Sequence, residues 1–348
     1  MFENKTVAVV VPCYDEETQV DQVLTKMPDF VDCIIVVDDA STDDTAGVVR
    51  RRMEADGDAG RTVLLEHEGN RGVGSAICTG YKEVVRRGID VAAVMAGDGQ
   101  MDPGELHFLV GPVARGETDY AKANRLFYQG AWGRTPGHRY LGNAFLSMLT
   151  KIASGYWHVA DSQTGYTAIS LEALRLLDLE AIYPGYGYPN DLLVRLNVFD
   201  MRVADIHTRP VYNVGERSKM RLWKVVPTMT WLIFKRFVWR MVRKYVISDF
   251  HPLVLFYTAA ALTGLLGLGF FVRLLWYWIA FGHIPPINTL VWVFCMISSV
   301  QFGLFGMWFD MEMNRYLNVN ASSPRAVRPP PAGAPPPAAN RAAGRRGG

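Results

Sequence analysis

The chain has 348 residues, with 36 Lys and Arg against 34 Asp and Glu. That length is sufficient for one large domain or two small ones. The formal net charge of +2 excludes a globally basic nucleic-acid-binding protein and an acidic solvating chain. The four cysteines form no C-x-x-C pair, so neither a disulfide framework nor a zinc site is predicted.

The first 215 residues or so alternate short apolar runs with polar helical stretches. Buried strands are predicted over residues 7–14, 32–39, 62–67 and 90–98. Helices are predicted between them, over residues 16–27, 43–55 and 73–87. This alternation indicates an α/β fold with a mainly parallel sheet, and ligands of such sheets bind beyond the carboxyl ends of the strands.

Three of these strands end in polar clusters, which are Pro12–Glu16, Asp38–Asp44 and Asp98–Asp102. A carboxylate at such an edge can accept hydrogen bonds from a nucleobase or a ribose, although acids also commonly cap the helix that follows. Asp98 and Gln100 are two residues apart on an extended segment, so their oxygens could hold Mg²⁺ or Mn²⁺ against a diphosphate. A simple turn is the alternative.

The loop Asn70–Gly74 precedes a helix that is expected to begin near Ser75. Its glycines allow close backbone approach, and a helix N-terminus favours a phosphate. A simple loop is the alternative.

Two long segments, residues 253–272 and 288–309, carry no charged side chain. Each is long enough to cross a hydrocarbon core of about 30 Å as a helix. Buried helices of a soluble protein are the alternative, but we predict a membrane protein with a soluble N-terminal part. Glycines in these segments could pack against a second copy in a homo-oligomer, or only relieve packing within one chain.

Residues 217–248 predict an amphipathic helix before the first span. Its apolar half contains Ile233, Phe234, Phe237, Val238, Met241, Val242 and Tyr245. Its basic half contains Lys235, Arg236, Arg240, Arg243 and Lys244. Such a helix suits an anionic membrane surface, and an ordinary helix packed on the soluble domain is the alternative.

The charges also predict an orientation. The segment Arg217–Ser248 has nine Lys and Arg and no acid, and the tail after Asn320 has five Arg and no acid. The positive-inside rule therefore places both flanks in the cytoplasm and the loop Gly282–Asn288 outside. The apolar run near the N-terminus is too short for a signal peptide, so the soluble domain and both termini are expected in the cytoplasm of a multi-pass membrane protein.

Six short motifs follow one another along the soluble part. Pro12–Glu16 is similar to P-x-Y-N-E, Val37–Ser41 to V-D-D-G-S, Asn70–Gly74 to N-x-G-K-G, Lys122–Arg125 to G-[SN]-R, Asp161–Tyr166 to D-x-x-S-G-F, and Gly215–Lys219 to G-E-S-K. Together they resemble the motifs of the family 2 glycosyltransferases, and within that family the polyprenyl-phosphate (dolichyl-phosphate) mannose and glucose synthases. The resemblance covers nearly all of residues 5–220, and the two spans match the membrane-anchored members.

The resemblance implies a GT-A type, Rossmann-like nucleotide-sugar-binding domain. It implies inverting transfer of a hexose, from UDP-glucose or GDP-mannose, to a polyprenyl monophosphate at the cytoplasmic membrane face. UDP-N-acetylhexosamine is a further donor. No nucleic-acid partner is expected.

The resemblance also implies roles for residues of this chain. The nucleotide sugar would be bound by Pro12, Tyr14, Glu16, Asp38, Asp39 and Gly72. Mg²⁺ or Mn²⁺ would be held by Asp98 and Gln100, of which Asp98 also counts as catalytic. The lipid phosphate would be held by Arg125, Arg139, Ser218 and Lys219. Asp161 and Asp191 are the remaining catalytic candidates, for positioning the acceptor or the sugar.

Three positions depart from the family pattern. Ala96 stands where the metal-binding D-x-D motif has its first acid, Val73 replaces the lysine of N-x-G-K-G, and Arg217 is an extra residue before Ser218. The first departure weakens the expected metal site, the second removes one donor contact, and the third changes the register of Ser218 and Lys219.

The predicted organisation has four parts. Residues 1–216 form a cytoplasmic GT-A domain, 217–250 a basic juxtamembrane region, 251–312 two transmembrane helices, and 313–348 a disordered tail rich in Pro, Ala and Arg. Two alternatives in function remain. One is an enzyme of this fold that acts on a lipid-linked saccharide or a cell-wall glycan, and the other is an inactive membrane scaffold, suggested by Ala96 and Val73.

Overall fold

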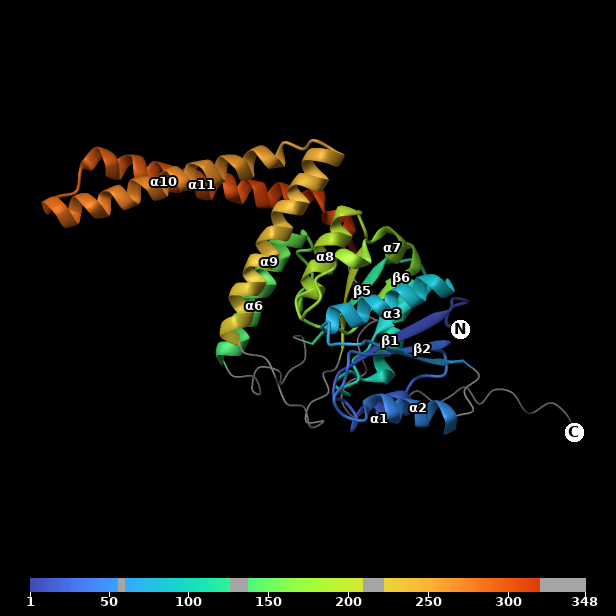
Figure 1. Ribbon diagram of the computed structural model, residues 1–348. Coiled ribbons are helices and arrows are strands. Elements are labelled where there is room, and N and C mark those ends of the chain that lie inside the picture. The colour runs from blue at the N-terminus through green and yellow to red at the C-terminus, as the bar shows by residue number, and fades with distance from the viewer. Residues whose placement is uncertain (56–59, 126–136, 209–221, 320–348) are drawn as a thin grey trace, which may run out of the picture.

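A computed structural model describes residues 1–55, 60–125, 137–208 and 222–319. An α/β domain occupies one side of the molecule, and two long antiparallel helices, α10 and α11, project away from it (Figure 1). Helix α9 leads from the domain to this pair, and the chain thus runs from the α/β domain through α9 into two apolar helices.

The sheet of the α/β domain has the strand order β3-β2-β1-β4-β6-β5-β7-β8 in the part of the chain that the structure describes. Its strands are β1 (Val7–Cys13), β2 (Cys33–Asp38), β3 (Thr62–Glu66), β4 (Val91–Val94), β5 (Tyr120–Asn124), β6 (Thr167–Ser170), β7 (Val203–His207) and β8 (Asn318–Val319). β6 is antiparallel to both of its neighbours, and the other neighbouring pairs are parallel. The sheet is therefore mainly parallel, as predicted.

Helices cover both faces of this sheet, which explains why its central strands are continuous apolar runs. In β1, Val10 packs toward α3 (Val73–Arg87), whereas Val9 packs toward the opposite face. The first face is covered by α3, α7 (Leu171–Leu176) and α8 (Tyr188–Val198). The second face is covered by α1 (Val20–Thr25), α2 (Thr45–Ala55) and α4 (Leu106–Ala114). All residues of β1, β2 and β4 are buried.

The apolar pair consists of α10 (Leu253–Phe281) and α11 (Pro286–Met313). At a rise of about 1.5 Å per residue, each is about 42 Å long and can cross a bilayer. Large apolar side chains on both helices are exposed, including Leu265 at 67% and Ile279 at 79%. A soluble core helix would bury such side chains, so these helices fit transmembrane helices.

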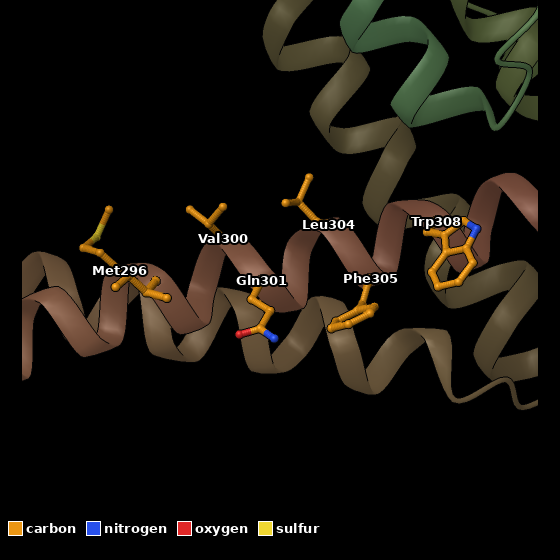
Figure 2. Close-up of a pocket in the computed structure, with 7 residues that line it drawn as sticks. Met296, Val300, Gln301, Leu304, Phe305 and Trp308 are labelled. Atoms are coloured by element: carbon orange, nitrogen blue, oxygen red, sulfur yellow. The ribbon is translucent and has the colours of Figure 1, made fainter.

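One side of α11 carries an apolar hollow of about 770 Å³, lined by Met296, Ile297, Val300, Gln301, Leu304, Phe305 and Trp308. Figure 2 shows Val300 and Leu304 pointing away from α10. Between the two helices, Ser299 Oγ donates to the carbonyl of Ala260 at 2.8 Å, and a Cβ on Gly264 would lie 2.8 Å from that hydroxyl. Gly264 therefore relieves packing within one chain, and a homo-oligomer remains a prediction.

Helix α9 (Leu222–Val242) continues as a π-helix over Arg243–Ser248 and packs on α6 (Gly137–Ser154) and α8. The expectation that its basic half faces a membrane surface is wrong for three of the five residues. Arg236, Arg240 and Lys244 form ion pairs within the protein, with Asp191, Asp310 and Asp200 respectively. Lys235 and Arg243 are exposed.

The tail predicted to be disordered from residue 313 begins with ordered structure. Leu317 is fully buried in the core of the α/β domain, and β8 pairs with β7 at the edge of the sheet. The chain thus returns to the α/β domain directly after α11. Residues 320–348 lie outside the described part of the chain.

Candidate active site

The carboxyl ends of β1, β2 and β4 bring the predicted polar clusters together. Because these strands are parallel neighbours, the segments that follow them leave the same edge of the sheet. The backbone N–H of Asp39 donates to the carbonyl of Cys13 at 2.9 Å, and that of Gly97 donates to Pro12 at 3.3 Å. The turn after β1 therefore lies between the other two.

The turns after β1 and β2 are bonded to each other. Asp15 and Ala40 have φ values of 55° and 60°, and these left-handed residues direct the two turns toward one another. The N–H of Asp15 donates to Ser41 Oγ at 3.0 Å, and the N–H of Thr42 donates to Asp15 Oδ1 at 2.8 Å. Glu16 N–H donates to Thr45 Oγ1 at 2.9 Å. The structure thus builds one surface from the two predicted nucleotide-binding turns.

Asp38 and Asp39 are both buried but have different partners. Asp38 accepts a short hydrogen bond from the hydroxyl of Ser41. Asp39 accepts from His67 Nδ1 at 2.7 Å, from the N–H of Arg71 at 2.8 Å and from the N–H of Gly72 at 2.7 Å. The contacts of Asp39 therefore hold the loop before α3, and its predicted contact with the nucleotide stays a prediction.

His67 is a site residue that sequence reasoning missed. Its Nε2 lies 2.9 Å from Thr79 Oγ1 of α3, while its Nδ1 contacts Asp39. The side chain joins the ends of β2 and β3 to α3. The available signal was its position, since His67 follows an apolar strand in the same way as Asp39 follows β2.

The turn that begins α3 is closed by a carbonyl from another loop. The N–H groups of Gly74 and Ser75 both donate to the carbonyl of Pro184, at 2.7 and 3.2 Å. Gly72 has φ of 92°, and a Cβ there would lie 2.6 Å from the same oxygen, so only glycine fits. The carbonyl of Pro184 accepts from two N–H groups that a phosphate would otherwise use. This turn therefore fits a simple loop rather than a phosphate site.

Asp98 is a half-buried carboxylate after β4. Its Oδ1 accepts from the N–H of Gln100 at 3.0 Å. Burial raises the pKa of Asp98, and that N–H and the charge of Arg125 oppose the shift. A divalent cation would favour the ionised carboxylate that burial disfavours, so Asp98 fits a metal ligand. No cluster of three or more His, Cys, Asp or Glu side chains suited to a metal occurs in the described ranges. A cation here would need oxygens from the substrate.

Arg125 and Asp161 form a charged pair from two predicted motifs. Arg125 Nε lies 2.8 Å from Asp161 Oδ2, and Nη2 lies 3.4 Å from Oδ1. Burial would raise the pKa of Asp161, but Arg125, the charge of Lys122 and the backbone N–H of Gln163 together outweigh burial, and the pKa is lowered. The Arg125 side chain is 43% exposed and that of Asp161 only 5%, so the arginine is the accessible partner.

Two buried titratable groups lie close to this pair. Lys122 donates a short hydrogen bond from Nζ to the carbonyl of Thr164, and burial lowers its pKa to about 7 against the opposing charge of Asp161. Asp205 accepts from Asn124 Nδ2 at 2.7 Å, and burial raises its pKa to about 6. Sequence reasoning used Lys122 only as part of a motif and missed Asp205, because a β7 residue gives no sign of its neighbours on β5.

Comparison with known proteins identifies the family. The sequence profile "Glycosyl transferase family 2" matches residues 8–177. An uncharacterized glycosyltransferase of Mycobacterium bovis is 31% identical over 217 residues, which are 62% of this chain and 89% of the relative. This chain belongs to glycosyl transferase family 2.

Other family 2 relatives have named activities. The UDP-N-acetylglucosamine–dolichyl-phosphate N-acetylglucosaminyltransferase of Methanococcus voltae is 27% identical over 220 residues, 59% of this chain and 87% of that protein. The undecaprenyl-phosphate mannosyltransferase of Micrococcus luteus is 28% identical over 218 residues, 62% and 87% respectively.

A solved structure supports the predicted GT-A fold. Glucosyl-3-phosphoglycerate synthase from Mycobacterium tuberculosis, crystallised with Mn²⁺, UDP and glucosyl-3-phosphoglycerate, superimposes with a TM-score of 0.50. It shares 22% sequence identity, and the match covers 68% of this chain and 80% of that one. The chain is a glycosyltransferase with the GT-A type fold.

Of the remaining predicted site residues of this family 2 enzyme, the structure describes the side chain of Asp191 but not those of Arg139, Ser218 and Lys219. Arg139 lies in the first turn of α6, where side chains are not described, and Ser218 and Lys219 lie outside the described residues. Asp191 is buried in α8, where it pairs with Arg236 at 2.5 Å. Catalysis by Asp191 and phosphate binding by the other three stay predictions.

Proposed function

We propose that this glycosyltransferase transfers a hexose from a nucleotide sugar to a polyprenyl monophosphate at the membrane surface. The observation that carries the proposal is the accessible Arg125 in a domain that ends in two exposed apolar helices. Arginine suits a phosphate because its planar fork can donate two hydrogen bonds at once. The names of two relatives, a dolichyl-phosphate and an undecaprenyl-phosphate transferase, support the same acceptor class.

The donor would lie against the turns after β1 and β2. Pro12, Tyr14, Glu16 and Asp38 would contact the nucleotide, while Asp39 and Gly72 would shape the loop beside it. Asp98 and Gln100 would hold Mg²⁺ or Mn²⁺. When bound, the metal supplies positive charge to the diphosphate leaving group, whose negative charge increases during the transfer.

The acceptor needs little activation. A phosphomonoester has a second pKa of about 6, so its oxygen is already anionic at neutral pH. This oxygen would form the new bond to the anomeric carbon as the bond to the diphosphate breaks, and the nucleoside diphosphate would leave with the electron pair. Attack from the face opposite the leaving group inverts the anomeric centre. Arg125 would orient the phosphate, and Asp161 would hold Arg125 in place.

The sugar is proposed as a hexose from UDP-glucose or GDP-mannose, with UDP-N-acetylhexosamine as a further donor. The two named relatives carry different sugars, N-acetylglucosamine and mannose, so they support the reaction class rather than one donor.

The active site is proposed to face the cytoplasm, because the basic flanks of the two spans favour that side. Exposed apolar side chains of α6 and α9, including Phe145, Trp231 and Phe234, would contact the lipid headgroup region. Lys235 lies over the ring of Trp231 at 5.2 Å, and aromatic and basic residues are common at that depth. In Figure 1, α6 and α9 run side by side at the base of α10 and α11.

Transfer assays in detergent test the proposal. Purified protein is incubated with Mg²⁺ or Mn²⁺ and a panel of radiolabelled nucleotide sugars, with and without undecaprenyl phosphate. We expect a labelled lipid with one donor, and much less with Arg125→Ala. Slow donor hydrolysis without a labelled lipid would contradict the acceptor and favour a saccharide or glycan instead.

A further inference from the structure

The junction between the catalytic domain and the apolar helices contains a buried ion pair. Arg240 of α9 and Asp310 near the end of α11 are both fully buried. Arg240 Nη1 donates to Asp310 Oδ1 at 3.0 Å and Nη2 donates to Oδ2 at 2.7 Å, so the guanidinium and the carboxylate meet fork to fork. This pair links α9 directly to α11.

The same guanidinium also binds the catalytic domain. Nη2 of Arg240 donates to the carbonyl of Ile152 in α6 at 3.1 Å, and Nη1 donates to Asn197 Oδ1 in α8 at 3.2 Å. One buried side chain therefore contacts three helices, two of them from the catalytic domain and one from the apolar pair.

Residues around the ion pair add further hydrogen bonds to Asp310. Tyr245 donates from its hydroxyl to Asp310 Oδ1 at 2.8 Å, and Asn314 Nδ2 donates to the same oxygen at 2.9 Å. Asn197 Nδ2 donates to Asn314 Oδ1 at 2.8 Å. Because a buried charge is costly unless it is paired and hydrogen-bonded, this network favours a single arrangement of the junction.

The backbone leaves room for this network. Gly155, directly after α6, has φ of 77°, and a Cβ there would lie 2.7 Å from Arg240 Nη1 and 3.0 Å from Asn314 Nδ2. A side chain at this position would displace the guanidinium.

Helix α6 connects the junction to the active site. Ile152 contacts Arg240, and Ser147, about 7 Å back along the helix, shares a 3.2 Å hydrogen bond with Ser162. Ser162 directly follows Asp161, the partner of Arg125. A change at the junction would thus shift the accessible arginine relative to the lipid.

We propose that Arg240 and Asp310 are positioning residues, which hold the catalytic domain at a fixed height and angle over the membrane so that Arg125 meets the headgroup of a membrane-embedded acceptor. This rests on the proposed function for the identity of the acceptor only. The junction between the catalytic domain and the apolar helices is seen in the fold itself and does not depend on the acceptor.

The first test measures how rigidly the junction holds the catalytic domain against the apolar helices, and it needs no substrate. Spin labels are placed at Glu172→Cys in α7 and His283→Cys between α10 and α11, both exposed, while all four native cysteines are buried. We expect a narrow distance distribution in the wild type and a clearly broader one in Asp310→Asn. Asp310→Asn leaves the buried charge of Arg240 without a partner, which can unfold the protein. The paired replacement Arg240→Met with Asp310→Leu removes both charges and therefore serves as a second, folded variant. A distribution as narrow as that of the wild type in the paired variant overturns the proposal.

The second test separates positioning from chemistry. In proteoliposomes, we expect the paired variant to lose about 10- to 100-fold in kcat/KM for undecaprenyl phosphate, since small misplacements have effects of this size. Transfer to a short, water-soluble isoprenyl phosphate and affinity for the nucleotide should stay within twofold. Arg243→Met, an exposed arginine on the same helical stretch, is the matched control and should change neither acceptor.

The outcomes are distinguishable. Equal losses for both acceptors, with nucleotide binding intact, overturn the positioning role. A wild type that labels neither acceptor contradicts the proposed function. The spin-label distances then test by themselves whether Arg240 and Asp310 hold the junction rigid.

Discussion

Asp191 of α8 lies 2.5 Å from the guanidinium of Arg236 of α9 and 3.2 Å from that of Arg195, one turn farther along α8. Asp191 also accepts from the backbone N–H of Tyr183 at 2.7 Å. The next residue, Pro184, is the one whose carbonyl closes the turn at the start of α3. A continuous series of contacts therefore runs from α9 to the loop that Asp39 holds.

Asp191→Asn is expected to destabilise the protein rather than to block chemistry alone. The variant leaves two largely buried arginines without their counter-charge, and breaking a buried ion pair costs about 3 kcal/mol or more. Chemical unfolding in detergent would measure this loss. Glu54→Gln, an exposed acid on α2, is the matched control and should leave the free energy of unfolding unchanged.

The opposite result would restore the predicted catalytic role of Asp191. That result is an Asp191→Asn protein with wild-type stability and no transfer activity.

Arg125→Lys is expected to raise the KM for the acceptor while leaving the KM for the donor nearly unchanged. Lysine keeps the charge but loses the planar fork that meets Asp161 and, in the proposed function, the acceptor phosphate. Initial rates at varied lipid and varied nucleotide sugar would separate the two constants. Arg86→Lys, at an exposed ion pair with Glu83, is the control. An unchanged KM for the lipid would remove Arg125 from the acceptor site.

Much of the fold follows from patterns that the sequence displays directly. The apolar runs of β1, β2 and β4 are buried on both faces, so their continuous character is visible without a partner. The lengths of α10 and α11 exceed the predicted spans because charge-free residues mark only the central part of such helices. Strands β5, β6, β7 and β8 were not among the four predicted strands, and β8 has only two residues, which carry no alternation to detect.

The orientation of α9 could not be predicted in the same way. Periodicity separates an apolar half from a basic half, but it does not say which half meets the protein. The outcome depends on Asp191 and Asp310, which are 45 and 70 residues from their arginine partners. Long-range contacts also explain why His67 and Asp205 were missed, since the partners of each lie on other strands, helices or loops.

Asp98→Asn is expected to abolish transfer while nucleotide binding remains measurable. The amide cannot supply the negative charge that a divalent cation needs, and the described residues contain no cluster of three or more His, Cys, Asp or Glu side chains that could replace it. A chelator should stop the wild-type reaction, and Mg²⁺ or Mn²⁺ should restore it. Full activity of Asp98→Asn in the presence of a chelator would contradict the role of Asp98 as a metal ligand.

Ala96→Asp tests the same site from the other direction. It restores the acid that the family motif has at this position, so half-maximal activity should require less Mn²⁺ than in the wild type. Titration of Mn²⁺ at saturating donor would measure the difference. An unchanged requirement would indicate that residue 96 does not face the cation.

The buried Lys122 predicts a specific dependence of stability on pH. Its pKa falls from 10.5 to about 7 on folding, so between these values the unfolded chain binds more protons than the folded one. Stability should therefore rise as the pH increases from about 7 to 10.5, because the free-energy cost of removing the proton from the lysine on folding decreases over this range. Asp205, with its pKa raised to about 6, acts with the opposite sign, and its contribution is lost between about pH 4 and 6.

Lys122→Met isolates the effect of the lysine, because methionine fills a similar volume without a charge. The free energy of unfolding of the wild type minus that of the variant should increase between pH 7 and 9, as measured by chemical unfolding in detergent. Lys82→Met, at an exposed ion pair with Glu180, controls for general loss of a surface charge and should give a flat difference. A flat difference for Lys122→Met as well would mean that the amine is solvated or paired when folded, and the hydrogen bond to Thr164 would then have to be made by a charged group.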